Sequence, residues 1–146
     1  LPMPKNLSKI IIYTDGGSRG NPGPSAIGVM INDKTYSECI SVGTNNEAEY
    51  RAVIFALKKT KALLGKEKIK NMEVELRSDS ELLIKQLNGE YKILEPKIQT
   101  LFLQVWNLKI DFGQVKFIAI PREKNKQADK LVNEALDTQV RTQTLF

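Results

Sequence analysis

Residues 8–15 have the sequence Ser8-Lys9-Ile10-Ile11-Ile12-Tyr13-Thr14-Asp15. Three isoleucines followed by an aromatic residue predict a β-strand over 8–14, because β-branched and aromatic side chains favour strands. Asp15 follows this predicted strand directly. A second strand is predicted over 72–78, and Asp79 follows it in the same way. Two carboxylates at strand ends indicate a site at one edge of a sheet, where α/β proteins bind ligands.

The rest of the chain continues an alternation of strands and helices. Further strands are predicted over 26–32, 35–42 and 115–120, a turn over 16–24, and helices over 45–64, 80–87, 95–113 and 125–137. Asn45 or Asn46 is expected to cap the first helix, and Asp79 or Ser80 the second. Trp106 is expected in the core. The order predicts an α/β fold, in which three leading strands form an antiparallel meander and two later strands lie parallel to the first.

Length and composition predict a single domain over residues 1–146, with a core at about 8–138 and a frayed tail at 139–146. No apolar run is long enough for a membrane span, and Leu1-Pro2-Met3-Pro4-Lys5 lacks the apolar centre of a signal peptide. A single cysteine, Cys39, excludes an intrachain disulfide and a zinc site built from several cysteines. We therefore expect a reducing, cytoplasmic setting.

The chain is basic, with 22 Lys and Arg against 17 Asp and Glu, a net charge of +5 and a pI of about 9.3. An excess of positive charge is typical of proteins that bind nucleic acid. Many soluble proteins are equally basic, so the charge favours this class of partner without selecting it.

Four carboxylates are the candidate catalytic residues: Asp15, Glu49, Asp79 and Asp129. The first and third end strands, and the other two lie early in predicted helices. The chain contains no histidine, the most common general base. A cluster of carboxylates instead suits Mg²⁺, which prefers oxygen ligands, and paired metal ions can hydrolyse phosphodiesters. Each acid alone would be read as a turn, cap or surface residue, so the interpretation depends on the set.

Four blocks of the sequence together resemble ribonuclease H of type 1. They are Thr14-Asp15-Gly16-Gly17-Ser18 with Gly20-Asn21-Pro22-Gly23, Thr44-Asn45-Asn46 with Glu49, Ser78-Asp79-Ser80, and Asn125 with Ala128-Asp129. Their order and spacing fit over residues 8–138. The resemblance implies the ribonuclease H-like fold, a five-stranded mixed sheet of three antiparallel and two parallel strands flanked by helices.

The resemblance also implies an activity and its site. The expected enzyme is an endoribonuclease that cuts the RNA strand of RNA/DNA hybrids and leaves a 5′-phosphate and a 3′-hydroxyl. The four acids match the metal ligands of the family, with Asp15 bridging two Mg²⁺ ions, for which Mn²⁺ is a possible substitute. Residues at Thr44 and Asn46 hold a phosphate of the DNA strand in the family, and those at Asn21 and Asn45 reach the minor groove, where ribose 2′-hydroxyls mark RNA.

The sequence departs from the family pattern at two places in the site. The family often has a histidine before the last acid, where this chain has Pro121-Arg122-Glu123-Lys124, so Arg122, Glu123 or Lys124 is a candidate substitute. Glu81 stands where the family commonly has glutamine. Glu81, Arg122, Lys124 and Asn125 are therefore possible further site residues.

A third departure concerns substrate binding outside the site. The chain lacks the extra basic helix that some members carry, so hybrid binding is expected to depend on Lys85, Lys92 and Lys97.

Three alternative functions stay open at this point. The chain could be a related nuclease for another duplex such as double-stranded RNA, or a hybrid-binding module without catalysis. It could also be the ribonuclease H domain of a reverse-transcribing polyprotein. Four intact acids argue against the binding module, because a binder gains nothing from a carboxylate cluster facing phosphate.

Overall fold

The central strand of the sheet is β1 (Ser8–Ser18), which carries the isoleucine run. The computed structural model describes residues 7–145, with side chains described through residue 139. The expectation about a signal peptide at residues 1–5 lies outside this range. The other strands are β2 (Gly23–Ile31), β3 (Lys34–Gly43), β4 (Met72–Ser78) and β5 (Gln114–Ala119). The helices are α1 (Asn45–Leu64), α2 (Lys66–Ile69), α3 (Glu81–Leu87), α4 (Pro96–Ile110), the short 3₁₀ helix η1 (Arg122–Lys124) and α5 (Lys126–Leu145).

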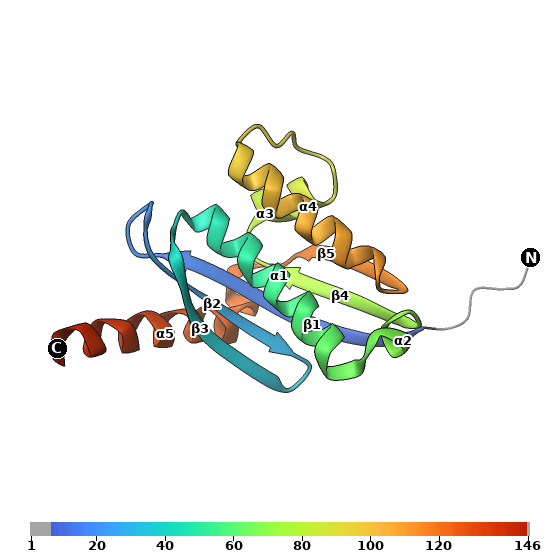
Figure 1. Cartoon of the computed structure of the whole chain (residues 1–146), viewed down its shortest axis with the longest axis horizontal. Coiled ribbons are helices and arrows are strands. Elements are labelled where there is room, and N and C mark those ends of the chain that lie inside the picture. The colour runs from blue at the N-terminus through green and yellow to red at the C-terminus, as the bar shows by residue number, and fades with distance from the viewer. Residues whose placement is uncertain (1–6, 146) are drawn as a thin grey trace, which may run out of the picture.

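The strands form one mixed sheet in the order β3-β2-β1-β4-β5. β1, β2 and β3 pair antiparallel, whereas β4 pairs parallel with both β1 and β5. α1 packs over β1 and β2 with α4 beside it, and α5 covers the other face at β1, β2 and β3 (Figure 1). This arrangement confirms the predicted α/β fold and its three-plus-two sheet.

The register of β1 and β4 brings the predicted strand-end acids to the same level. The last parallel pair is Tyr13 with Arg77, and Asp15 and Asp79 each lie two residues beyond it. Strand side chains repeat every second residue, so Asp15 projects on the same face as Tyr13. The first and fourth strands are neighbours, a pairing that the sequence allowed but did not require.

Two glycines let helices approach the sheet closely from its two faces. A Cβ built on Gly16 would lie 2.3 Å from the carbonyl carbon of Ala48 in α1. A Cβ built on Gly28 would lie 2.2 Å from the carbonyl oxygen of Ala128 in α5. Ala48 directly precedes Glu49 and Ala128 directly precedes Asp129, so these two contacts set the depth at which each helix presents its acid.

Several boundaries differ from those predicted, and the turn segment differs most. β1 continues through Asp15 to Ser18, so Gly16 and Gly17 are strand residues and not part of a turn. The reason is packing, because the backbone of α1 occupies the space where a Cβ of Gly16 would lie. The short helix α2 was not predicted, and its four residues are too few for a periodic pattern.

The helix ends also needed correction. Thr44, and not Asn45 or Asn46, caps α1, and its Oγ1 accepts the N–H of Glu47 at 3.2 Å. Of the two residues predicted to cap α3, Ser80 is the one that does so. α5 continues to Leu145, so the tail predicted to fray at 139–146 is helical through residue 145. No Gly or Pro occurs within α5 to end it sooner.

Trp106 was predicted to be a core residue, and this prediction is wrong. Its side chain is 48% exposed, whereas Val105 next to it is buried. Trp106 stacks on Phe102, with the Nζ of Lys109 5.3 Å from its ring centroid. The buried residues of α4 are Ile98, Leu101 and Val105, and because successive helical residues point about 100° apart, Trp106 lies beside this narrow stripe.

We predict that Gly16→Ala destabilises the protein by at least about 3 kcal/mol, because the added methyl group meets helix backbone and not a movable side chain. Urea unfolding in the presence of chelator would measure the change. Gly89→Ala is the matched control, because Gly89 has a φ of 75° and open space around it. That control should cost only about 1 kcal/mol of backbone strain. Equal losses in the two variants would contradict the close-contact argument.

Candidate active site

A polar cleft at the carboxyl ends of β1 and β4 contains all four predicted acids. Asp15 comes from β1, Asp79 follows β4, Glu49 lies in the second turn of α1, and Asp129 lies in the first turn of α5. Each element reaches the cleft by its strand end or helix N-terminal end. The structure therefore brings together residues that are far apart in the sequence.

The environment of the cleft changes the protonation of Asp15 and Glu49. Burial raises the pKa of Asp15 from 3.8 to about 8, and the negative charges of the three other acids add to this increase. Burial likewise raises the pKa of Glu49 from 4.5 to about 7, with a further contribution from Asp79. An N–H from Gly16 to the Asp15 carboxylate, at 3.0 Å, opposes the increase only in part. Such perturbed carboxyls in a cleft are typical of functional sites.

Asp79 is the acid with a cationic neighbour. Burial raises the pKa of its carboxyl, and the positive charge of Arg122 acts in the opposite direction. The Arg122 Nε lies 3.9 Å from Asp79 Oδ2, although the arginine side chain is 92% exposed. Arg122 is thus the candidate substitute for histidine that faces a site acid, whereas Lys124 lies beside Tyr13 and Met30 outside the cleft.

The donor set fits divalent cations by its chemistry. All four groups are carboxylates, and each further negative charge makes ionisation of Asp15 harder, which a bound cation would relieve. Among the described residues, no three acidic side chains already form a ligand set around one point.

Three of the predicted substrate-binding residues meet beside the cleft. The backbone N–H of Asn45 donates to Asn21 Oδ1 at 3.0 Å, and Asn45 Oδ1 accepts the N–H of Ser18 at 2.9 Å. These bonds tie the β1–β2 loop to the N-terminus of α1. Thr44 caps the same helix, as described above. Their contacts with nucleic acid stay predictions.

Asn46 and Glu81 lie close to the site but differ in environment. Asn46 Oδ1 is buried and has no hydrogen-bond partner among the described residues. Glu81 is exposed in the first turn of α3. Its carboxylate is therefore free to face solvent or a bound strand.

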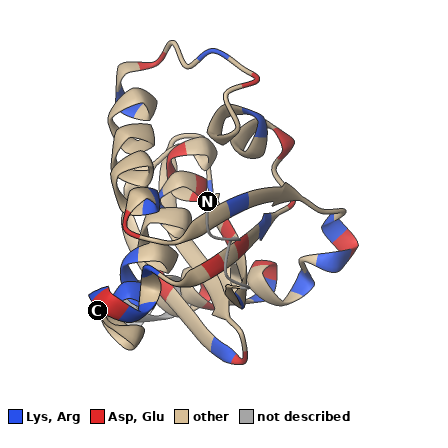
Figure 2. Cartoon of the chain, turned by 90° about the vertical axis from the view of Figure 1, so that its right-hand side faces the viewer, with Lys and Arg blue, Asp and Glu red and all other residues tan. Residues whose placement is uncertain are grey.

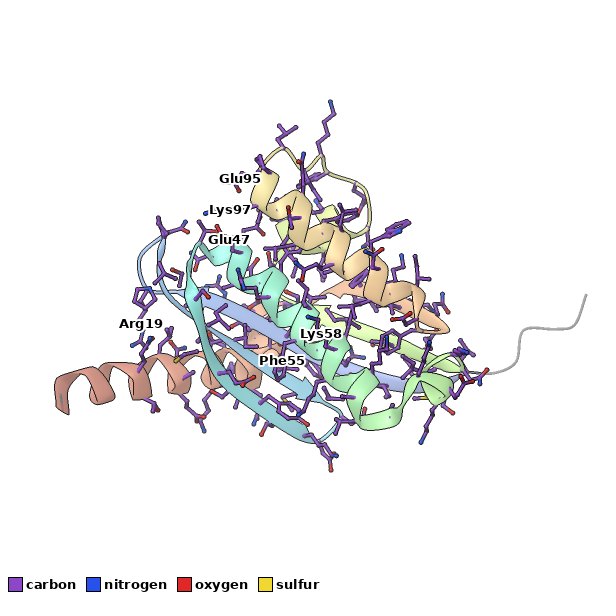
Figure 3. The ribbon with its side chains drawn as sticks, in the orientation of Figure 1. Arg19, Glu47, Phe55, Lys58, Glu95 and Lys97 are labelled. Carbon is purple, nitrogen blue, oxygen red and sulfur yellow. The ribbon has the colours of Figure 1, made fainter. Side chains whose placement is uncertain are left out.

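The sequence reasoning missed Arg19, which lines the cleft. Arg19 belongs to the β1–β2 loop, and its side chain reaches toward α5 (Figure 3). There its guanidinium donates to Asp137 Oδ1 at 2.6 Å. The partners are 118 residues apart, so no local pattern could have shown the pair. Ser80 was predicted only as a helix cap, and it also acts as a hydrogen-bond donor to Glu49 that lowers the pKa of that carboxyl.

Charged residues outside the cleft are spread over the fold. Lys and Arg positions occur on helices, strands and loops, interleaved with Asp and Glu (Figure 2). On the outer face of the sheet the charges are paired, with Lys9 Nζ 3.0 Å from Glu75 Oε1 and Lys116 Nζ 3.2 Å from Glu73 Oε1. None of the helices within residues 7–145 combines the length and apolar character needed to cross a bilayer.

We predict that the metal-free protein loses stability as the pH rises from about 4 to 8. The folded state holds protons on Asp15 and Glu49 that the unfolded state releases at lower pH, so their contribution is complete below about pH 4 and lost near pH 8. Thermal unfolding in chelator would measure this decline. Asp15→Asn should raise the metal-free Tm at pH 8 by roughly 2–8 °C, or about 1–2 kcal/mol, and Mg²⁺ should remove most of the difference. A Tm that does not change over this pH range would contradict the coupling.

Comparison with known proteins places this geometry in a family. A family model described as "Reverse transcriptase-like" matches residues 13–135. A protein named Ribonuclease HI from Halobacterium salinarum is 36% identical over 141 residues, which cover 92% of this chain and 68% of that protein. The mycobacterial "Bifunctional protein Rv2228c" from Mycobacterium tuberculosis is 34% identical over 136 residues. This chain spans only 36% of the length of that bifunctional protein.

A solved structure agrees in fold and sequence. LC11-RNase H1, isolated from compost by a metagenomic approach, is 46% identical with a TM-score of 0.85 over 92% of this chain and 99% of its own. A second structure of LC11-RNase H1 is in complex with an RNA/DNA hybrid and has a TM-score of 0.84. These likenesses extend over nearly the whole length of each chain and include both the sheet and the helices that carry the acids. The chain belongs to the ribonuclease HI family.

Proposed function

We propose that this protein is an endoribonuclease that hydrolyses the RNA strand of RNA/DNA hybrids with divalent metal ions, preferentially Mg²⁺. The observation that carries this proposal is the set of four coupled carboxylates in an open polar cleft. The complex of LC11-RNase H1 with an RNA/DNA hybrid supports the choice of substrate. The single Cys39 supports a reducing, cytoplasmic setting.

The metal ligands in this proposal are Asp15, Glu49, Asp79 and Asp129. The negative charges of all three other acids act on Asp15, which supports the proposal that Asp15 would hold divalent cations together with them. When bound, the ions supply an activated water and stabilise the departing 3′ oxygen, which leaves a 5′-phosphate on the product. The exposed guanidinium of Arg122 beside Asp79 is the proposed partial substitute for the absent histidine.

The substrate strands are proposed to lie on the two sides of this cleft. Thr44 and Asn46, at the N-terminal end of α1, would bind a DNA phosphate, because free N–H groups and the helix dipole attract anions there. Asn21 and Asn45 would contact the minor groove. The hydrogen bond between these two residues supports this role, because it holds the loop and the helix in a fixed relation before any duplex binds.

We predict that the protein cuts end-labelled RNA internally in an RNA/DNA hybrid, and that chelator abolishes the cutting. Asp79→Asn should lower kcat by at least about 100-fold, because it removes a charge from the proposed metal site. The assay would include double-stranded RNA and single-stranded RNA, with Mg²⁺ and with Mn²⁺. Glu73→Gln is the matched control, because Glu73 lies in β4, the strand that Asp79 follows, and pairs with Lys116 on the outer face.

The outcomes separate the alternatives. Cutting of double-stranded RNA at a rate equal to the hybrid would favour the related nuclease. Binding of the hybrid without cutting, under either metal, would contradict the enzyme assignment and favour a binding module. Retained activity in Asp79→Asn would contradict the metal-site assignment alone.

Glu81 gives a second prediction about the substrate. Glu81→Gln should lower the KM for the hybrid by about 2–4-fold at low salt, because it removes a negative charge at the first turn of α3 close to the proposed phosphate path. The effect should shrink as salt increases, since screening weakens exposed charges. Steady-state kinetics at two salt concentrations would test it, with Glu90→Gln in the following loop as the control. An unchanged KM at low salt would show that Glu81 points away from the substrate.

A further inference from the structure

Asn125 is a buried polar residue that joins the central strand to the helix carrying Asp129. It lies between η1 and α5, and only 1% of its surface is exposed. Its Nδ2 donates a hydrogen bond of 3.0 Å to the backbone carbonyl of Thr14, a residue 111 positions earlier. Thr14 directly precedes Asp15. The bond therefore connects the N-terminus of α5 to the strand position next to the central acid.

Asn125 also interacts with two further acids. Its backbone carbonyl accepts the N–H of Asp129 at 3.2 Å, which forms the first turn of α5. Its side-chain amide acts as a hydrogen-bond donor toward Asp79, which lowers the pKa of that carboxyl. Asn125 thus interacts with the backbone or side chains at three of the four acids, on three different elements.

Ordinary helix capping does not explain this arrangement. An asparagine cap uses its side-chain oxygen to accept an N–H from the first turn of the helix. Asn125 Oδ1 is buried and accepts no hydrogen bond from any described residue. An unpaired buried oxygen is unfavourable, so stability alone does not account for the side chain on its acceptor side. Its donor side, directed at Thr14 and Asp79, is the part that the site uses.

We propose that Asn125 is a positioning residue that fixes the spacing of Asp15, Asp79 and Asp129 before any cation binds. The inference rests on the proposed function, in which these acids hold the metal ions. Groups that hold metal ligands in place commonly affect metal affinity or activity by about 10–100-fold. Loss of the amide donors should therefore weaken both metal binding and turnover, while leaving substrate binding unchanged.

The test compares Asn125→Leu and Asn125→Ala with the wild-type protein. Leucine has the same branching as asparagine but lacks both the amide donor and the unpaired oxygen, so it separates positioning from loss of stability. Gln127→Ala is the control, because it removes an exposed amide two residues away. The measurements are kcat and KM on an RNA/DNA hybrid, and, without substrate, the Mg²⁺ concentration that gives half of the increase in Tm.

We expect kcat to fall by about 10–100-fold in Asn125→Leu, with KM within about 2-fold of the wild-type value. The Mg²⁺ midpoint in the Tm titration should rise by at least about 5-fold, and the control should match the wild type. A folded Asn125→Leu variant with wild-type kcat and Mg²⁺ midpoint would overturn the proposal. A raised KM with unchanged kcat would also overturn it, because that pattern indicates a substrate contact.

Two further measurements test the proposal if the variants do not fold or if the metal-site assignment is wrong. If neither variant folds, NMR on the wild-type protein would follow the Asn125 side-chain amide protons, which should exchange slowly and shift as Mg²⁺ is added; rapid exchange would refute the proposal. Asp79→Asn is assayed in parallel. Activity in Asp79→Asn would show that the metal-site assignment is wrong, whereas an inactive Asp79→Asn beside a fully active Asn125→Leu would refute the positioning role alone.

Discussion

Two contacts between backbones, one on each face of the sheet, determine where the site can form. Gly16 lies against the carbonyl of Ala48, and Gly28 lies against the carbonyl of Ala128. Each helix contacts the sheet at the alanine directly before its acid. Glu49 and Asp129 therefore reach the edge of the sheet where β1 ends. Side chains of any size at the two glycines would move these helices outward. The carboxylate cluster therefore depends on main-chain packing before any electrostatic interaction.

The cluster of carboxylates lowers the stability of the fold. Burial and repulsion by the neighbouring acids raise the pKa of Asp15 to about 8, so Asp15 resists the charged state that metal binding would need. Partial compensation comes from neutral or cationic groups around them, such as the N–H of Gly16, the hydroxyl of Ser80 and the guanidinium of Arg122. In the proposed function a bound cation would supply what these groups leave incomplete, and occupancy of the site would then stabilise the whole fold.

Much of this structure follows from local sequence patterns. The strands at Ile10–Ile12 and Val74–Leu76 follow from their β-branched and apolar residues, and the first helix follows from its apolar spacing. Two of the acids were found from their place at the ends of the predicted strands. What local patterns cannot show is contact over distance: Arg19 with Asp137, or Asn125 with Thr14, are separated by more than a hundred residues. The extent of β1 was missed for a related reason, since glycine in a turn and glycine under a helix look the same in sequence.

The parallel register of β1 and β4 has a consequence for changes in chain length. Asp15 and Asp79 share one level because each lies two residues past the pair Tyr13 and Arg77. Deleting one residue within β4 would turn its side chains to the opposite face and separate the two acids. Residues 88–95 lie outside every strand ladder, so insertions there leave the register intact. A change of length in this connection therefore leaves β1 and β4 in register, whereas the ladder that leads to the two acids must keep its length.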